Sequence, residues 1–451
     1  DMKHLYSYNV IMYLRTLAAC EKFRFDNYSL FKILPENDQQ YKVLQDVQRD
    51  DSRFDFWTDP LPLREFVNVM TSPGDKADLE EILQKHGIKY EIVMKNIQEA
   101  IDDETVSTFS RSSVRNMEWN VYYNLSQING WLDNLVSTYP NIVSKIVGGV
   151  SYEGRKIEGI KISHGSGRRA IFIESGIHAR EWISPATTCY IINELLTSNY
   201  TETVAAARDY DWYIFPVTNP DGYYSSTFQN QYRIFRMWRK NRQPYGSNFG
   251  VDLNRNWNNN WLAKMINLSG SSTNPALDTY AGPGPFSEPE TRSLSTYIAS
   301  IADQIDLYIA THSFGHLLLL PFGNSTQPYG NYHDMNIGRR AMGALSVRHG
   351  TIYRTGNIAE AIYMATGGSV DWVKEQLRVP LVYVYEFRDD GTHGFLLPPD
   401  QIIPNSEEVM DSLLELIHQA KRFGYLNSSN RLISSTYICL SAFIVTLLRY
   451  Y

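Results

Sequence analysis

Most of the chain alternates between short apolar runs and longer segments in which apolar residues recur every three or four positions. The short runs predict strands at 170–174, 212–217, 306–311, 317–321 and 382–387. The longer segments predict helices at 182–196, 337–349 and 406–422. Strands this continuously apolar are usually buried on both faces. The pattern over residues 117–425 therefore predicts an α/β domain, with a mixed or mainly parallel sheet covered by helices.

A smaller α+β unit is expected before it, at residues 21–110. Strand-like runs lie at 29–34, 54–57, 65–70 and 88–91, and helical patterns at 75–85 and 92–101. His86 and Gly87 form a helix stop before the strand at 88–91. Residues 111–116 are polar and contain Arg111 and Arg115. They predict a linker that a trypsin-like protease would cut. A plain interdomain loop is the alternative.

Both ends of the chain carry apolar segments. Residues 1–20 have the outline of a secretory signal, which Arg15 interrupts. The tail at 426–451 contains an apolar run at 432–448, whose length is at the lower limit for a membrane-spanning helix. A lipid-anchor signal and an extension without a role are the competing interpretations of this tail. The ends thus favour a secreted protein, with membrane tethering as an alternative.

Composition narrows the functional classes. The 42 Lys and Arg residues are outnumbered by 49 Asp and Glu, and the net charge is −7. Because no basic stretch could gather phosphates, a nucleic-acid partner is not expected. Three cysteines cannot build a disulfide framework, which favours a reducing compartment, whereas several Asn-x-Ser/Thr sequons favour secretion. Composition alone leaves the compartment open.

Three potential metal ligands follow predicted strands. His178 and Glu181 lie just after the strand at 170–174, beyond a glycine that permits a sharp turn, and His312 follows the strand at 306–311. The carboxyl ends of strands in an open α/β sheet are where sites assemble. Two histidines and one glutamate leave the fourth zinc position free for water, as in catalytic sites. Taken alone, the His-x-x-Glu pair is more typical of a surface hydrogen bond.

Glu386 lies inside the apolar strand at 382–387, where a carboxylate is costly unless it has a partner or a function. It could supply the base that a zinc hydrolase needs. From the strand alone, an internal ion pair with Arg388 or another cation is the better interpretation. Arginines such as Arg239 and Arg255 are, one by one, typical of solvated surface charges.

Together the motifs resemble the carboxypeptidase A/B family of zinc metallocarboxypeptidases, in the right order and over nearly the whole chain. The matching stretches are GIHAREW, WRKNR, GVDLNRNW, THSFGHLLLLPFG, IYMATGGSVDW and YEFRDDGTHGFLLPPDQIIP, with FDFW and HGIKYEIVMKNIQEAIDDE in the N-terminal unit. The resemblance implies a catalytic domain with a mixed eight-stranded sheet. It also implies a ferredoxin-like prodomain that blocks the cleft until it is cleaved.

The resemblance implies a role for each matching residue. His178, Glu181 and His312 would bind one Zn²⁺ per catalytic domain, and Asp252 would orient His178. Glu386 would be the general base, and Arg239 would stabilise the developing oxyanion. The residues that would contact the substrate are Arg180, Asn254, Arg255, Tyr363 and Val370.

Val370 occupies a position at which an acid in this family favours C-terminal Lys or Arg. The other matching pocket positions are Gly323, Ile358 and Val384, so we expect cleavage of aliphatic and aromatic C-terminal residues. The expected protein is a secreted, monomeric zymogen that acts on peptide C-termini after a trypsin-like protease has activated it. The alternatives are a membrane-tethered regulatory carboxypeptidase and a catalytically silent peptide-binding homologue.

Overall fold

The computed structural model describes residues 24–51, 53–60, 66–104, 116–227, 236–262, 270–326, 332–362 and 364–426. The predicted signal segment, Arg111, Arg115 and the apolar tail from residue 427 lie outside these ranges. The boundaries proposed for the units at 21–110, 111–116, 117–425 and 426–451 therefore stay predictions. Among the described residues, no helix combines the length and apolar content that a membrane span needs.

The N-terminal unit is a four-stranded antiparallel sheet in the order β2-β3-β1-β4, packed against helices. Its strands are β1 (Ser29–Leu34), β2 (Phe54–Phe56), β3 (Val67–Thr71) and β4 (Lys89–Met94), and its helices are α2 (Asp38–Asp50), α3 (Lys76–Lys85) and α4 (Ile97–Asp103). The helix predicted at 92–101 is wrong in its first half. The strand continues to Met94, which pairs with Leu30 of β1. The helix begins only after Asn96, whose side chain accepts a hydrogen bond from the Gln98 amide.

The second, larger unit contains the predicted mixed eight-stranded sheet, in the order β13-β12-β14-β11-β7-β8-β6-β5. Its strands are β5 (Val143–Val150), β6 (Lys156–Ile162), β7 (Ala170–Ser175), β8 (Asp211–Phe215), β11 (Ile305–Ser313), β12 (Leu317–Leu320), β13 (Arg354–Asn357) and β14 (Leu381–Phe387). Strands β8, β7, β11 and β14 run parallel to one another at the centre. Their carboxyl ends therefore meet at one edge of the sheet.

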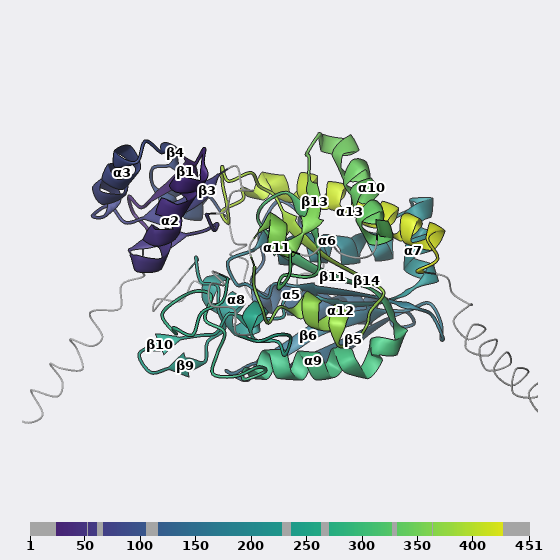
Figure 1. Ribbon diagram of the computed structural model, residues 1–451. Coiled ribbons are helices and arrows are strands. Elements are labelled where there is room, and N and C mark those ends of the chain that lie inside the picture. The colour runs from purple at the N-terminus through teal and green to yellow at the C-terminus, as the bar shows by residue number, and fades with distance from the viewer. Residues whose placement is uncertain are drawn as a thin grey trace, which may run out of the picture.

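Helices cover both faces of this sheet (Figure 1). One face packs against α5 (Leu125–Thr138), α6 (Ile183–Thr197), α10 (Tyr332–His349) and α13 (Ile402–Arg422), and the other against α9 (Pro289–Ile301) and α12 (Ser369–Glu375). Side chains alternate between the two cores along each strand. In β14, Tyr383 and Tyr385 join the α13 core, whereas Val382 and Val384 join the α12 core. This alternation fixes the face that each polar residue at a strand end presents.

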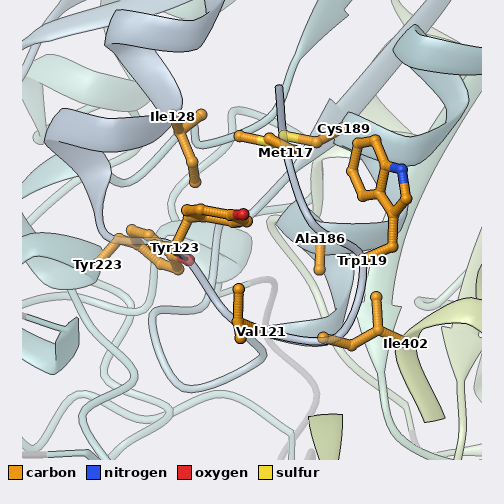
Figure 2. Close-up of a pocket in the computed structure, with 9 residues that line it drawn as sticks. All are labelled: Met117, Trp119, Val121, Tyr123, Ile128, Ala186, Cys189, Tyr223 and Ile402. Atoms are coloured by element: carbon orange, nitrogen blue, oxygen red, sulfur yellow. Dashed lines mark hydrogen bonds between the residues drawn. The ribbon is translucent and has the colours of Figure 1, made fainter. Parts of the chain in front are cut away.

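A small apolar cavity lies near the start of the larger unit, beside α6 (Figure 2). It is lined by Met117, Trp119, Val121, Tyr123, Ile128, Ala186, Cys189, Tyr223 and Ile402. Its free volume of about 10 Å³ is at the lower limit for one water molecule. Burial raises the pKa of the Cys189 thiol, which keeps it protonated at neutral pH. The cavity is a gap in core packing and contains none of the predicted site residues.

Candidate metal centre and active site

The predicted ligands and the predicted base converge at the edge where the parallel strands end. His178 and Glu181 lie in the turn between β7 and α6, and His312 is the penultimate residue of β11. In the register between β11 and β14, His312 is paired with Glu386. Neighbours across a strand pair point to the same face of a sheet, so Glu386 lies beside His312. Two strands and one turn thus deliver all four side chains to one place.

His178, Glu181 and His312 form a compact buried cluster whose ligand atoms all lie within 4.8 Å of one another. His178 Nδ1 is 2.8 Å from one Glu181 carboxylate oxygen, and His312 Nδ1 is 3.1 Å from the other. The two Nδ1 atoms are 3.1 Å apart. Despite burial, the two histidines hold the pKa of Glu181 below its usual range. The cluster therefore offers two imidazole nitrogens and an anionic carboxylate to a cation.

Asp252 connects this cluster to a neighbouring arginine. One oxygen of the fully buried Asp252 lies 3.1 Å from His178 Nε2, and the other accepts a 2.8 Å hydrogen bond from Arg239 Nη2. Burial alone would raise the pKa of Asp252, but Arg239 and Arg255 hold it well below its usual range. Arg239 Nη1 also lies 3.7 Å from Glu181. His178 and Arg239 are therefore oriented by the same carboxylate.

Two of the predicted substrate-binding residues, Asn254 and Arg255, lie next to Asp252. Arg255 is buried and donates to the backbone oxygens of Asn254 and Gly270. The Asn254 side chain accepts a 3.0 Å hydrogen bond from the Ser369 amide at the start of α12, the helix that carries Val370. Asn254 thus links the loop that contains Arg255 to the helix that contains Val370. Tyr363 lies outside the described residues.

Asp371, which directly follows Val370, is a buried acid that no sequence pattern singles out as a site residue. Both carboxylate oxygens of Asp371 accept hydrogen bonds from the Gly323 amide, at 2.9 and 3.1 Å. Burial raises the pKa of Asp371 to about 7. A Cβ placed on Gly323 would lie 3.3 Å from Ile358 Cγ2 and 3.2 Å from the Ala365 carbonyl oxygen. A larger residue than Gly323 would therefore press against Ile358 and Ala365, and Asp371 binds the backbone of the Gly323 loop.

Arg388 has a different partner from the one that the sequence suggested. Its guanidinium makes a bidentate ion pair with Glu408 on α13, at 2.7 and 2.8 Å. Glu408 itself is fully buried. Glu386 therefore does not serve as the carboxylate that neutralises Arg388.

Comparison with known proteins agrees with this arrangement. The family described as zinc carboxypeptidase matches residues 128–412, and that described as carboxypeptidase activation peptide matches residues 31–104. Zinc carboxypeptidase A 1 of Anopheles gambiae is 39% identical over 419 residues, which cover 92% of this chain and 94% of the relative. The zinc carboxypeptidase of Simulium vittatum is 47% identical over 314 residues, 68% of this chain and 100% of the relative. The crystal structure of carboxypeptidase A from Helicoverpa armigera shares 28% identity with a TM-score of 0.77, over 89% of this chain and 99% of that one.

The fold and site are those of a metallopeptidase, and the chain belongs to the zinc carboxypeptidase family. It carries the activation peptide of the family's zymogens N-terminal to the catalytic unit. The resemblance drawn from the ordered motifs is confirmed.

The activation peptide packs against the catalytic unit beside the site (Figure 1). The Trp57 ring lies 5.3 Å from the Phe395 ring, which in turn contacts Phe314 just beyond His312. Burial raises the pKa of Asp55 to about 6, although the positive charge of Arg180 opposes this. Arg180 lies 4.3 Å from the centre of the same Phe395 ring, so Trp57 of the activation peptide packs close to a residue that we predicted to bind substrate.

A buried ion pair fastens the end of the activation peptide. Glu104 and Arg236 each expose only 1% of their side chain, and their bidentate contacts measure 2.5 and 2.7 Å. Arg236 also donates to the backbone oxygen of Arg180 and lies 3.7 Å above the Trp182 ring. Glu104 thereby holds the peptide against the segment that contains Glu181.

Replacing Glu104 by Gln should weaken inhibition in the intact zymogen, because losing one partner of a buried pair costs about 3–5 kcal/mol. We expect the uncleaved variant to have measurable activity on a blocked dipeptide, at least ~10-fold above the wild-type zymogen. The mature enzyme is an internal control, because cleavage near Arg111 or Arg115 removes residue 104. Lys32→Ala, which breaks an exposed pair with Asp390, should change little. Equal activity of the two uncleaved zymogens would contradict the role of Glu104.

Proposed function

We propose that this zinc carboxypeptidase releases aliphatic or aromatic residues from peptide C-termini, and that its active site lies at the carboxyl ends of β7, β11 and β14. One observation carries the proposal: His178, Glu181 and His312 surround a single point, with Glu386 in register beside His312. The catalytically silent alternative is not favoured, because no ligand and no base has been lost.

In this proposal His178, Glu181 and His312 hold one zinc ion. Neighbouring ligands of a tetrahedral zinc with bonds of ~2.0–2.1 Å lie about 3.3 Å apart, so the 3.1 Å between the histidine nitrogens suits this ion. Asp252 fixes the ring of His178 from the other side. When bound, zinc lowers the pKa of water to ~7 and polarises the scissile carbonyl.

Protein side chains carry out the proton transfers and stabilise the oxyanion. Glu386 takes a proton from the attacking water and transfers it to the nitrogen of the leaving amino acid. Arg239, oriented by Asp252, donates to the carbonyl oxygen as negative charge develops there. Arg239 is buried and Glu386 is half-buried, and partial removal from water strengthens these interactions.

Exopeptidase specificity follows from recognition of the terminal carboxylate. Arg255, Asn254 and Tyr363 would bind it, because a guanidinium fork matches a carboxylate in two hydrogen bonds. Arg180 would contact the substrate further from its end. Val370 gives the pocket an apolar wall, and the Asp371 carboxylate accepts hydrogen bonds from the Gly323 backbone N–H. An internal peptide bond offers no carboxylate and should not be cleaved.

We further propose that the protein is a secreted monomer, activated by a trypsin-like protease at Arg111 or Arg115. The N-terminal apolar segment and the sequons support secretion, and the basic residues of the linker support the protease class. Membrane tethering through the tail is the alternative. Partitioning of the expressed protein into detergent, or its release by a phospholipase, would favour the tether.

A panel of blocked dipeptides tests the proposal. The full chain is assayed on substrates ending in Phe, Leu, Lys or Arg, before and after trypsin, with and without 1,10-phenanthroline. We expect activity on Phe and Leu only after trypsin and only without the chelator. Activity that survives the chelator would contradict the metal assignment, and activity confined to Lys and Arg would contradict the pocket assignment.

A further inference from the structure

We propose that Asn219 is a positioning residue of the active site, whose side-chain amide holds the loop of His178 against the loop of Arg239. The inference rests on the roles proposed above for those two residues. Asn219 comes between β8 and α8 (Pro220–Thr227), and its side chain touches neither the candidate metal ligands nor Glu386 among the contacts described here. It acts through the backbone.

The Asn219 amide bridges two chain segments that are far apart in sequence. Its Nδ2 donates to the backbone oxygens of Ile177 and Lys240, both at 3.1 Å, and lies 3.4 Å from that of Arg239. Ile177 immediately precedes His178. A single fully buried amide group therefore contacts the backbone next to a proposed metal ligand and the backbone of the proposed oxyanion residue.

The surrounding hydrogen bonds make the two loops one unit. The backbone N–H of Ala179 donates to the Arg239 backbone oxygen at 3.1 Å, and the backbone N–H of Asn219 donates to the Gly176 backbone oxygen at 3.2 Å. The Oδ1 atom of Asn219 accepts a 3.0 Å bond from the Gly222 amide, which fixes the rotation of the side-chain amide. Both Oδ1 and Nδ2 of Asn219 are thus hydrogen-bonded, and Nδ2 donates to both loops.

The packing leaves no room for adjustment. A Cβ on Gly222 would lie 2.5 Å from Asn219 Nδ2 and 2.6 Å from the Lys240 oxygen. An aspartate at 219 would keep the shape but would place carboxylate oxygen against the carbonyl oxygens of Ile177 and Lys240. Because like-signed atoms repel, the two loops should move apart. A misplacement of ~1 Å in an active site can cost about 10²-fold in rate.

The pattern of kinetic changes distinguishes positioning from general destabilisation. Movement of the His178 loop should weaken zinc binding by about 10–100-fold, the usual effect of losing a group that orients a ligand. Movement of Arg239 should lower kcat by about 10²-fold. The proposed carboxylate-binding residues Asn254 and Arg255 lie on a different loop, so KM should change by less than about threefold.

The test compares Asn219→Asp with Asn405→Asp after trypsin activation of the full chain. Asn405 is also fully buried, but its side-chain amide donates to Thr187 of α6 and accepts from the Arg388 backbone N–H, and no described hydrogen bond joins it to either loop. For each variant we would measure kcat and KM on a dipeptide ending in Phe, the zinc dissociation constant by competition with a chromogenic chelator, and Tm. We expect Asn219→Asp to lose kcat and zinc affinity, and Asn405→Asp to lower only Tm. If Asn219→Asp does not fold, Asn219→Ser should give an intermediate loss of about tenfold, since it keeps one donor.

The variant His178→Ala tells failure of the positioning role of Asn219 apart from failure of the metal-site assignment. If it loses zinc and activity while the Asn219 variants match the wild type in kcat and zinc affinity, the positioning role is wrong and the site assignment stands. Equal losses of kcat in the Asn219 and Asn405 variants, in proportion to Tm, would also contradict the positioning role. If His178→Ala keeps full zinc affinity and activity, the site assignment itself is wrong.

Discussion

Replacing Glu386 by Gln should lower kcat on a dipeptide ending in Phe by about 10²–10⁴-fold, the usual contribution of a general base. Gln has nearly the same size and can still accept a hydrogen bond, but it cannot take up a proton. Because Glu386 is proposed to act on the proton and not to bind zinc, KM and zinc content should change little. Steady-state kinetics of the trypsin-activated enzyme, with metal analysis of the same sample, would measure both.

Glu408→Gln provides the matched control for Glu386→Gln. Glu408 is a buried glutamate of the same catalytic unit, and its partner is Arg388. The control should lower Tm, because it weakens a buried pair, without a comparable loss of kcat. Full activity of Glu386→Gln would show that the base is a different group.

Replacing Arg255 by Ala should remove the preference for a free C-terminal carboxylate. The variant loses a charge-assisted pair and, with it, the orientation of the peptide, so kcat/KM for the free acid should fall by about 10²-fold or more. The amidated form of the same peptide never had this pair and should be affected far less. The measurement is the ratio of kcat/KM for the acid and the amide.

Arg255→Lys refines this experiment, because Lys keeps the positive charge but loses the planar fork. We expect its ratio of acid to amide to lie between those of the wild type and Arg255→Ala. An unchanged ratio in Arg255→Ala would mean that another group recognises the carboxylate.

The strands that carry the site were predictable because each is a continuous apolar run. The runs at 170–174, 306–311 and 382–387 correspond to β7, β11 and β14 within two residues at each end. The rule that sites assemble at strand ends then brings His178 and His312 together. Strand register was not predictable, because no residue in either strand marks which partner it faces. The pairing of His312 with Glu386 therefore required the structure.

Other strands could not be predicted because they contain no continuous apolar run. β13 has the sequence Arg-Thr-Gly-Asn and contains no large apolar residue, and β5, at an edge of the sheet, is buried at only two of its eight positions. The start of α4 did carry a signal, since Asn96 is followed three residues later by Glu99, as in a helix cap. That signal was outweighed by the apolar run that ends at Met94.

The role proposed for Asn219 could not be predicted from the sequence. The sequence Asn-Pro-Asp-Gly at 219–222 is a strong turn signal, and a turn is what the sequence alone predicts there. The acceptors of its side chain, at Ile177 and Lys240, come from segments that only the folded sheet brings together. A role exerted through backbone oxygens leaves no mark on the residues that it positions.

The zinc content of His312→Ala, compared with that of the wild type purified in parallel, tests the central claim most directly. His312 is the ligand supplied by a second strand, and its removal leaves only the pair from the β7 turn. We predict one zinc ion per chain in the wild type and less than about a tenth of that in the variant after dialysis against a weak chelator. A variant that retains one zinc ion per chain would contradict the assignment of this cluster as the metal centre.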